Sequence, residues 1–458
     1  MSVDTNNAAF QDALNLIQYT RQSVFLTGKA GTGKSTFLRY VCEHTKKKHV
    51  VLAPTGIAAI NAGGSTMHSF FKLPFYPLLP DDPNLSLQRG RIHEFFKYTK
   101  PHRKLLEQIE LVIIDEISMV RADLIDAIDR ILRVYSHNLR EPFGGKQLLL
   151  VGDVFQLEPV VKNDEREILN RAYPTPYFFS ARVFSQIDLV SIELQKVYRQ
   201  TDSVFVSVLD HIRTNTAGAA DLQLLNTRYG SHIEESEADM YITLATRRDT
   251  VDSINEKKLA ELAGEPITFE GSIEGDFPES SLPTSQELVL KPGAQIIFIK
   301  NDFDRRWVNG TIGVIAGIDE EEETIYVITD DGKECDVKRE SWRNIRYRYN
   351  EKTKEIEEEV LGSFTQYPIR LAWAITVHKS QGLTFSRVVI DFTGGVFAGG
   401  QAYVALSRCT SLDGIQLKKP INRADIFVRP EIVNFAGRFN DRQAIDKALK
   451  QAQADVQY

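Results

Sequence analysis

The chain has 458 residues, 42% of them hydrophobic and 26% charged, which is the balance of a globular protein with about three domains. Its formal net charge of −7 argues against a protein that coats nucleic acid over its whole surface, while a basic cleft within an acidic shell stays compatible with it. Three scattered cysteines, no apolar run of membrane-spanning length and no signal or transit segment predict a cytoplasmic protein with no membrane contact.

The first predicted elements surround a glycine-rich stretch. A helix is predicted over residues 8–20 and a buried strand over 23–27. Residues 28–35 then satisfy the pattern GxxxxGK[ST], in which backbone N–H groups surround phosphates, Lys34 adds a positive charge and Ser35 can ligate Mg²⁺. The sequence therefore predicts a site for ATP and Mg²⁺. The other predicted contacts of this loop are Gly31, Thr32, Gly33 and Thr36.

A second predicted strand, residues 49–53, leads into a segment of small and polar residues that ends in aromatic ones. Such residues permit close backbone approach and supply hydrogen bonds to phosphate, and aromatic rings offer faces for base stacking. The alternative for the aromatic residues is core packing. The candidate DNA contacts here are Pro54, Thr55, Gly56, Thr66, His68, Ser69 and Phe70. The proline-rich residues 72–80 predict a rigid loop, either a wedge that separates DNA strands or a plain surface connector.

Two more apolar strands are followed by polar residues that suit nucleotide hydrolysis. The strand at 111–114 runs into Asp115, which would hold Mg²⁺, and Glu116, which would polarise the attacking water. The strand at 147–151 is followed by Gln156, whose amide can contact a γ-phosphate or its attacking water. Four strands, each followed by helical or loop material, predict a parallel, doubly wound sheet with its ligand at the carboxyl ends of the strands.

The rest of the chain predicts a second α/β lobe interrupted by a β module. Strands are expected at 188–194, 241–245 and 387–391, a helix at 370–382, and a polar helix and tail after residue 438. Alternating strands and tight turns between 318 and 361 predict a small antiparallel insertion. The predicted domains are a first lobe at 1–186 (wedge loop at about 64–80), a second lobe at 187–297 and 362–435, a β insertion at 298–361, and a terminal helix and tail at 436–458.

Five segments in this order carry a resemblance to a known family: residues 53–59, 115–120, 152–160, 378–384 and 403–408. Together they resemble the PIF (petite integration frequency) family of superfamily 1B DNA helicases, over most of the chain from about Gln11 to Arg408. The resemblance implies two RecA-like lobes, an SH3-like β insertion in the second, and ATP-driven 5′-to-3′ motion on single-stranded DNA. Because the long N-terminal extension of eukaryotic members is missing here, a compact bacterial or phage-like version is expected.

The resemblance also implies roles for individual residues. Gln11 would read the adenine, Arg199 and Arg408 would be arginine fingers from the second lobe, and Gln156 would link nucleotide to DNA. Gln381 and Gly382 would join the nucleotide site from the second lobe. Further implied DNA contacts are Asn309, Thr376, His378 and Lys379. From the residues alone, Gln11 suits a solvated helix, the two arginines suit surface ion pairs, and His378 suits a buried core histidine.

The predicted partners are single-stranded DNA and forked or tailed duplexes, with quadruplexes and RNA–DNA hybrids as further substrates. The protein is expected to act as a monomer, with a dimer on DNA as the alternative. Two other functions remain open at this point. One is a translocase that moves on single strands and separates duplexes poorly. The other is a nucleotide-gated switch that binds nucleic acid without processive motion, or a protein directed at RNA.

Overall fold

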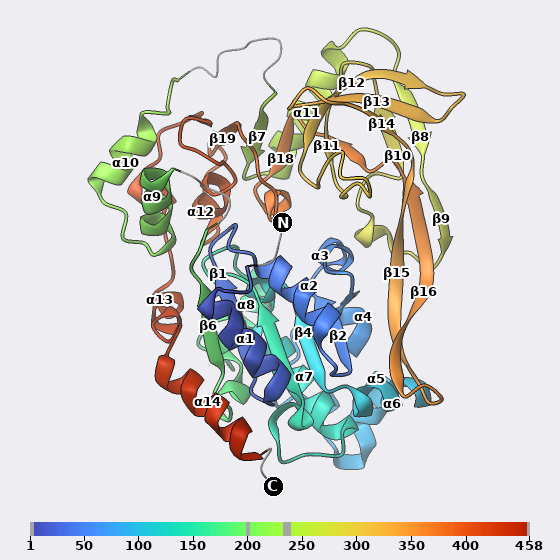
Figure 1. Cartoon of the computed structure of the whole chain (residues 1–458), viewed down its shortest axis with the longest axis vertical. Coiled ribbons are helices and arrows are strands. Elements are labelled where there is room, and N and C mark those ends of the chain that lie inside the picture. The colour runs from blue at the N-terminus through green and yellow to red at the C-terminus, as the bar shows by residue number, and fades with distance from the viewer. Residues whose placement is uncertain (1–3, 198–201, 232–239, 456–458) are drawn as a thin grey trace.

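The computed structural model describes residues 4–197, 202–231 and 240–455. Figure 1 shows a first lobe in its lower half, a second lobe at the upper left, and a β module at the upper right from which a long hairpin runs down beside the first lobe. The two α/β lobes and the β insertion agree with the predicted fold class. No helix within the described ranges is long and apolar enough to cross a membrane.

The first lobe is built on a six-stranded sheet, all parallel, in the order β3-β2-β4-β5-β1-β6. Apolar residues fill these strands almost continuously because helices cover both faces of such a sheet. The strands are β1 (Val24–Gly28), β2 (His49–Ala53), β3 (Ser65–Thr66), β4 (Leu111–Ile114), β5 (Gln147–Val151) and β6 (Val190–Leu194). The helices are α1 (Ala8–Tyr19), α2 (Lys34–His44), α3 (Gly56–Ala62), α4 (Met67–Phe71), α5 (Arg91–Phe96), α6 (Lys100–Gln108), α7 (Ala122–Tyr135) and α8 (Asn163–Asn170).

The second lobe has a four-stranded parallel sheet in the order β18-β7-β19-β20. Its strands are β7 (Ile242–Ala245), β18 (Ala374–Thr376), β19 (Val388–Asp391) and β20 (Ile415–Leu417). Its helices are α9 (Ser203–Arg213), α10 (Ala219–Asn226), α11 (Arg248–Glu261) and α12 (Gln401–Leu406). The apolar faces of α9 and α12 pack into one buried cluster with this sheet, so the second lobe has its own core.

The β module is larger than predicted. Its strands are β8 (Ile267–Glu270), β9 (Ser272–Gly275), β10 (Glu287–Leu290), β11 (Gln295–Phe298), β12 (Ile312–Asp319), β13 (Thr324–Thr329), β14 (Glu334–Val337), β15 (Glu340–Asn350), β16 (Glu355–Gln366) and β17 (Ile369–Leu371). Because β9 pairs with β16, and β11 with β17, the predicted limits 298–361 are wrong at both ends.

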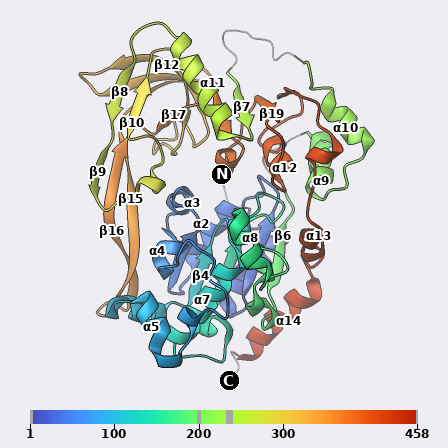
Figure 2. The ribbon, with the colours of Figure 1, turned by 180° about the vertical axis from the view of Figure 1, so that it is seen from behind.

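The hairpin β15–β16 reaches the first lobe, and the view from behind shows the same path (Figure 2). Tyr347 on β15 accepts a hydrogen bond at its hydroxyl from the backbone N–H of Val51 on β2, at 3.3 Å. Ile345, Tyr347 and Tyr349 are buried in the same apolar cluster as the first-lobe core. The hairpin therefore ties the β module to the first lobe through side-chain packing as well as through the chain.

Three further predictions about chain organisation are corrected. β6 pairs in parallel with β1 of the first lobe, so the predicted boundary at 186/187 is wrong. Residues 369–380 form β17, β18 and a 3-10 turn at His378–Ser380, where a helix was predicted. The C-terminal helices α13 (Pro430–Ala436) and α14 (Arg442–Asp455) return to the first lobe, where Ile432 lies in the core. An apolar run shows that a segment is buried, but not which sheet or core receives it.

Candidate active site at the lobe interface

The phosphate loop has the predicted strand–loop–helix context between β1 and α2. Gly28 has φ +154°, and a Cβ placed there would lie 2.5 Å from Thr32 Oγ1 and 2.7 Å from the Leu194 carbonyl oxygen, so only glycine fits. Gly33 has φ +91° directly before α2 begins at Lys34. The Lys34 ammonium donates to the carbonyl oxygens of Gly28 (2.7 Å) and Lys29 (3.1 Å). The loop is thus a folded cradle with the lysine charge held inside it.

Asp115 and Glu116 lie at the carboxyl end of β4. The Glu116 backbone is left-handed (φ +50°), and its N–H donates to Asp115 Oδ1 at 2.9 Å. Burial raises the pKa of Asp115, and burial together with the charge of Asp115 raises the pKa of Glu116 to about 7. Lys34 and Arg408 oppose the rise at Glu116. A carboxyl poised near neutral pH suits a group that must take up a proton from water.

Arg408 comes to this region from the second lobe and is only 1% exposed. Its guanidinium donates to the carbonyl oxygens of Val404 (3.0 Å), Ser380 (3.3 Å) and Leu383 (3.3 Å). Gln381 and Gly382 lie in the turn between the last two acceptors, so these two predicted residues and Arg408 are brought together. The other predicted finger, Arg199, lies outside the described residues.

Gln156 follows β5 in a buried loop that meets the second lobe. Gly400, which precedes α12, lies against this loop so closely that a Cβ there would be 2.3 Å from the Gln156 carbonyl oxygen. In the same loop, Asp153 accepts a hydrogen bond from Arg213 at the end of α9, at 3.1 Å. Arg213 also pairs with Glu193 at 2.8 Å and is 4% exposed on its side chain. Arg213 is not among the predicted site residues; its sequence signal is a cation at the end of an apolar helix.

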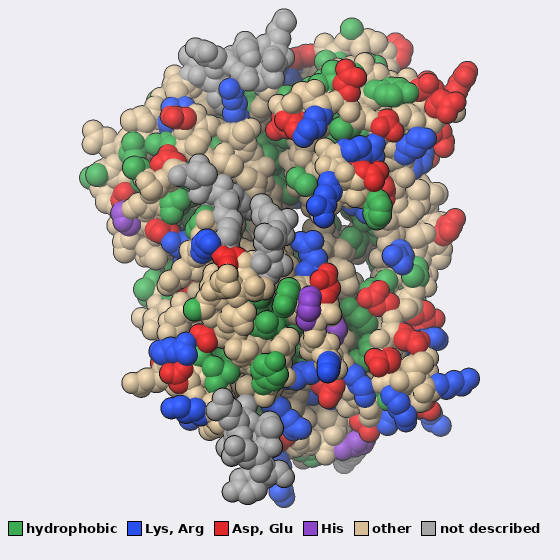
Figure 3. Space-filling model, in the orientation of Figure 1, with side chains coloured by type: hydrophobic (Ala, Val, Ile, Leu, Met, Phe, Trp, Pro, Cys, Tyr) green, Lys and Arg blue, Asp and Glu red, His purple; other side chains and the backbone are tan. Residues whose placement is uncertain are grey.

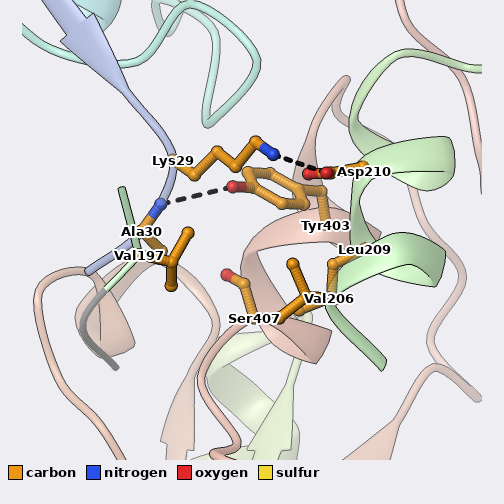
Figure 4. Close-up of a pocket in the computed structure, with 8 residues that line it drawn as sticks. All are labelled: Lys29, Ala30, Val197, Val206, Leu209, Asp210, Tyr403 and Ser407. Atoms are coloured by element: carbon orange, nitrogen blue, oxygen red, sulfur yellow. Dashed lines mark hydrogen bonds and ion pairs between the residues drawn. The ribbon is translucent and has the colours of Figure 1, made fainter. Parts of the chain in front are cut away.

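A small pocket separates the phosphate loop from α9 and α12, and Figure 4 shows its lining. The Lys29 ammonium pairs with Asp210 of α9, and the Ala30 N–H donates to the Tyr403 hydroxyl of α12 at 3.3 Å. The rest of the lining is Val197, Val206, Leu209 and Ser407. Asp210 and Tyr403 are not among the predicted site residues, although Tyr403 begins a segment that carries the resemblance, because their positions beside the loop depend on how the lobes meet.

The predicted adenine reader Gln11 lies in the first turns of α1, where its side-chain amide donates to the carbonyl oxygen of Thr5 at 2.7 Å. This contact joins the helix to the segment that precedes it. The adenine role stays a prediction.

The predicted DNA contacts of the first lobe follow β2. Thr55 caps α3, and Thr66 caps α4, each by accepting a backbone N–H at its hydroxyl. Pro54 and Gly56 flank the first cap, and a Cβ on Gly56 would overlap Ser281 of the β module. These residues therefore lie where the first lobe meets the β module. Ser69 is exposed on α4.

The second-lobe candidates surround the turn after β18. The Thr376 hydroxyl accepts from the Lys379 N–H at 3.2 Å, which fixes the turn, and the Lys379 side chain is exposed. His378 is half-buried, and burial lowers its pKa, so the ring is neutral at neutral pH. Asn309, on a loop of the β module, donates its backbone N–H to Asn301. All four stay predictions as DNA contacts.

The aromatic residues after α3 divide into core and surface. Phe70 is 4% exposed and packs edge-to-face on Phe71, so the prediction that it stacks on bases is wrong and the core alternative holds. In contrast, Phe75 is 82% and Tyr76 51% exposed. His68 stacks on Phe75, with ring centroids 4.9 Å apart. Residues 72–80 contain no helix or strand, as their prolines predict.

Comparison with known proteins decides the family. A family model described as PIF1-like helicase matches residues 4–217. The ATP-dependent DNA helicase Pif1 of Campylobacter jejuni is 33% identical over 412 residues, which cover 86% of this chain and 88% of that protein. The chain belongs to the PIF1-like helicase family. As a member it is an ATP-dependent helicase with two RecA-like lobes.

Solved structures of the family agree with the fold. Bacteroides Pif1 in complex with ADP-AlF4 is 41% identical and has a TM-score of 0.86, over 94% of this chain and 96% of that one. Bacteroides Pif1 bound to ssDNA is 40% identical and has a TM-score of 0.67, over 97% of this chain and 99% of that one. The arrangement of lobes described above is thus nearer to the first of these two family structures than to the second.

Proposed function

We propose that this helicase hydrolyses ATP between its lobes in order to move 5′-to-3′ along single-stranded DNA and to open the duplex ahead. The observation that carries the proposal is that Lys34 of the first lobe and Arg408 of the second both lie close enough to Glu116 to oppose the rise of its pKa. A cation that completes the site from the opposite lobe couples hydrolysis to closure of the lobes.

Nucleotide and metal fit the residues present. The glycine cradle, the Lys34 ammonium and the positive end of α2 suit phosphate groups. The Ser35 hydroxyl and the Asp115 carboxylate are the oxygen ligands that Mg²⁺ prefers. When bound, Mg²⁺ neutralises charge on the phosphate oxygens. Glu116 would orient the attacking water and accept its proton, because its raised pKa makes it basic enough near neutral pH.

Single-stranded DNA would be held at two places that move relative to each other. The first grip is the capped segment at Thr55 and Thr66, and the second is the turn at Thr376 to Lys379. Figure 3 shows a hollow between the β module and the first lobe with Lys and Arg side chains along its edge, which suits a phosphate backbone. If one grip slips while the other holds, each cycle of closure and opening advances the protein along the strand. Hydroxyl and lysine contacts to phosphate, without base reading, allow this motion on any sequence.

Duplex opening is assigned to the loop at residues 72–80. Leu73 and Leu78 are buried and anchor its two ends, while Phe75 and Tyr76 project between them. A rigid loop with projecting aromatic rings can stack on the last base pair and hold the strands apart. We propose that the protein does this as a monomer. The second candidate function is a translocase that moves on single strands and separates duplexes poorly. Such a protein needs the same ATP site but does not need this loop.

The test compares ATP hydrolysis with single-stranded DNA, with RNA and with neither. Single-stranded DNA is expected to stimulate hydrolysis more than RNA of equal length does. Glu116→Gln should abolish turnover yet keep binding of labelled single-stranded DNA, whereas the exposed control Glu107→Gln should behave like the unchanged protein. DNA-stimulated hydrolysis that survives in Glu116→Gln, or stimulation by RNA alone, would overturn the assignment.

A further inference from the structure

We infer that Tyr403 of the second lobe binds the phosphates of the nucleotide from the Ala30 side of the phosphate loop, held there by the Lys29–Asp210 ion pair. The inference rests on ATP binding at residues 28–35. It adds a neutral hydrogen-bond donor from the opposite lobe to the charged groups already named. Figure 4 shows Tyr403, Ala30, Lys29 and Asp210 around one small pocket.

The hydroxyl of Tyr403 lies at the loop itself. It accepts the Ala30 N–H at 3.3 Å, and backbone N–H groups of this loop are the groups that surround phosphate in proteins with this motif. Tyr403 is 3% exposed, so its hydroxyl is shielded from bulk water. A second-lobe group therefore lies within hydrogen-bond distance of the loop's own donors.

The hydroxyl also keeps a hydrogen to give. A phenol that accepts one hydrogen bond still donates through its O–H. Within the described part of the chain, the bond from Ala30 is the one hydrogen bond formed by the Tyr403 hydroxyl. A buried donor without an acceptor is costly, and a phosphate oxygen beside Ala30 would satisfy it with a charge-assisted bond. Burial raises the pKa of Tyr403 well above its usual range, so the proton stays in place.

Two contacts hold the tyrosine in position. Lys29 occupies a variable position of the GxxxxGK[ST] pattern, so its ion pair with Asp210 serves the lobe contact and not the motif. On the other side, α12 begins at Gln401 after Gly400, whose close approach to the Gln156 loop leaves no space for a Cβ. Opening the lobes would break the ion pair and the Tyr403 bond together. Closure of the lobes thus brings the Tyr403 hydroxyl into contact with the phosphate loop.

The experiment measures binding of a fluorescent ATP analogue and the steady-state kinetics of hydrolysis with single-stranded DNA. Tyr403→Phe should weaken analogue binding and raise KM for ATP roughly tenfold, the effect of one hydrogen bond to a charged group, with a smaller change in kcat. The matched control is Tyr367→Phe, which loses another buried hydroxyl, bonded to the Glu323 carbonyl oxygen in the β module. It should leave KM unchanged.

A charge exchange tests the ion pair. Lys29→Asp and Asp210→Lys alone should each raise KM roughly fivefold, as expected for a partly exposed pair, and the double variant K29D/D210K should restore it. Unchanged KM in Tyr403→Phe, or no recovery in the double variant, would overturn the inference. The inference would also be overturned if Tyr403→Phe lost more thermal stability than Tyr367→Phe, because a loss of folded protein would then account for the weaker binding. If the unchanged protein binds the analogue but shows no DNA-stimulated hydrolysis, the proposed function fails and the binding measurements still decide the role of Tyr403.

Discussion

Arg213 at the end of α9 donates to Asp153 of the first lobe at 3.1 Å, and both side chains are buried. Its guanidinium also lies over the ring of Phe155, 4.4 Å from the centroid. This contact joins the second lobe to the loop that carries Gln156, one residue beyond Phe155. The lobes are therefore joined by a buried charge pair beside the ATP site as well as by the chain.

We expect Arg213→Met to lower the free energy of unfolding by about 3–5 kcal/mol, because Asp153 would stay buried without its cation. Urea denaturation followed by fluorescence measures the loss. The control is Arg348→Ala, which removes an exposed ion pair with Glu357 and should leave the free energy of unfolding nearly unchanged. Equal effects of the two substitutions would contradict a structural role for the buried pair.

The raised pKa of Glu116 predicts a pH dependence of hydrolysis. If Glu116 must be ionised, kcat/KM for ATP should rise with pH through a midpoint near its pKa of about 7 and level off above it. A profile that is flat from about one pH unit below that midpoint to about one unit above it would count against Glu116 as the base.

The same group predicts the sign of a stability change. Its pKa in the folded state lies above its ordinary value, so the folded state binds the proton more tightly and this contribution to stability falls as pH rises from the ordinary pKa of 4.5 to about 7. Glu116→Gln should remove that dependence and raise the thermal midpoint above pH 7. A lower midpoint for Glu116→Gln at alkaline pH would mean that ionised Glu116 is stabilised in the fold.

Arg408→Lys should lower kcat by about 10³-fold with ATP binding retained, since a lysine cannot span the carbonyls of Ser380 and Leu383 and still present a planar cation. Arg228→Lys is the matched control. Arg228 also donates to backbone carbonyls of the second lobe, those of Asp413 and Ile415. A similar fall in both variants would mean that Arg408 acts only in folding.

Phe75→Ala combined with Tyr76→Ala should reduce duplex unwinding while single-stranded DNA still stimulates hydrolysis, because the rings project from a loop whose anchors stay buried. Strand separation and ATP turnover are measured on the same preparation. Tyr19→Ala, which removes a 68% exposed ring on α1, is the control and should change neither. Unwinding that persists in the double variant would make the loop a surface connector.

The local half of the site could be predicted from the sequence. The phosphate loop and the pair Asp115–Glu116 are short segments whose chemistry and spacing suffice, and Arg408 was found through the resemblance. Roles for Arg213 and Asp210, and for Tyr403 at the start of a segment that carries the resemblance, could not be predicted this way, because each acquires its role only from a partner in the other lobe.

Sheet membership was also beyond the sequence. β6 has the apolar pattern of any buried strand, and only its pairing with β1 shows which lobe it completes. Phe70 illustrates the same limit for side chains, since a phenylalanine beside a polar segment suits a base or a core equally well until its burial is known.

The central claim is ATP-driven motion in the 5′-to-3′ direction, and unwinding of tailed duplexes tests it most directly. Identical duplexes carry a single-stranded tail on either the 5′ or the 3′ end, and strand release is followed with ATP and Mg²⁺. The account predicts release from the 5′-tailed duplex and none from the 3′-tailed one. Release from the 3′-tailed duplex alone would contradict it.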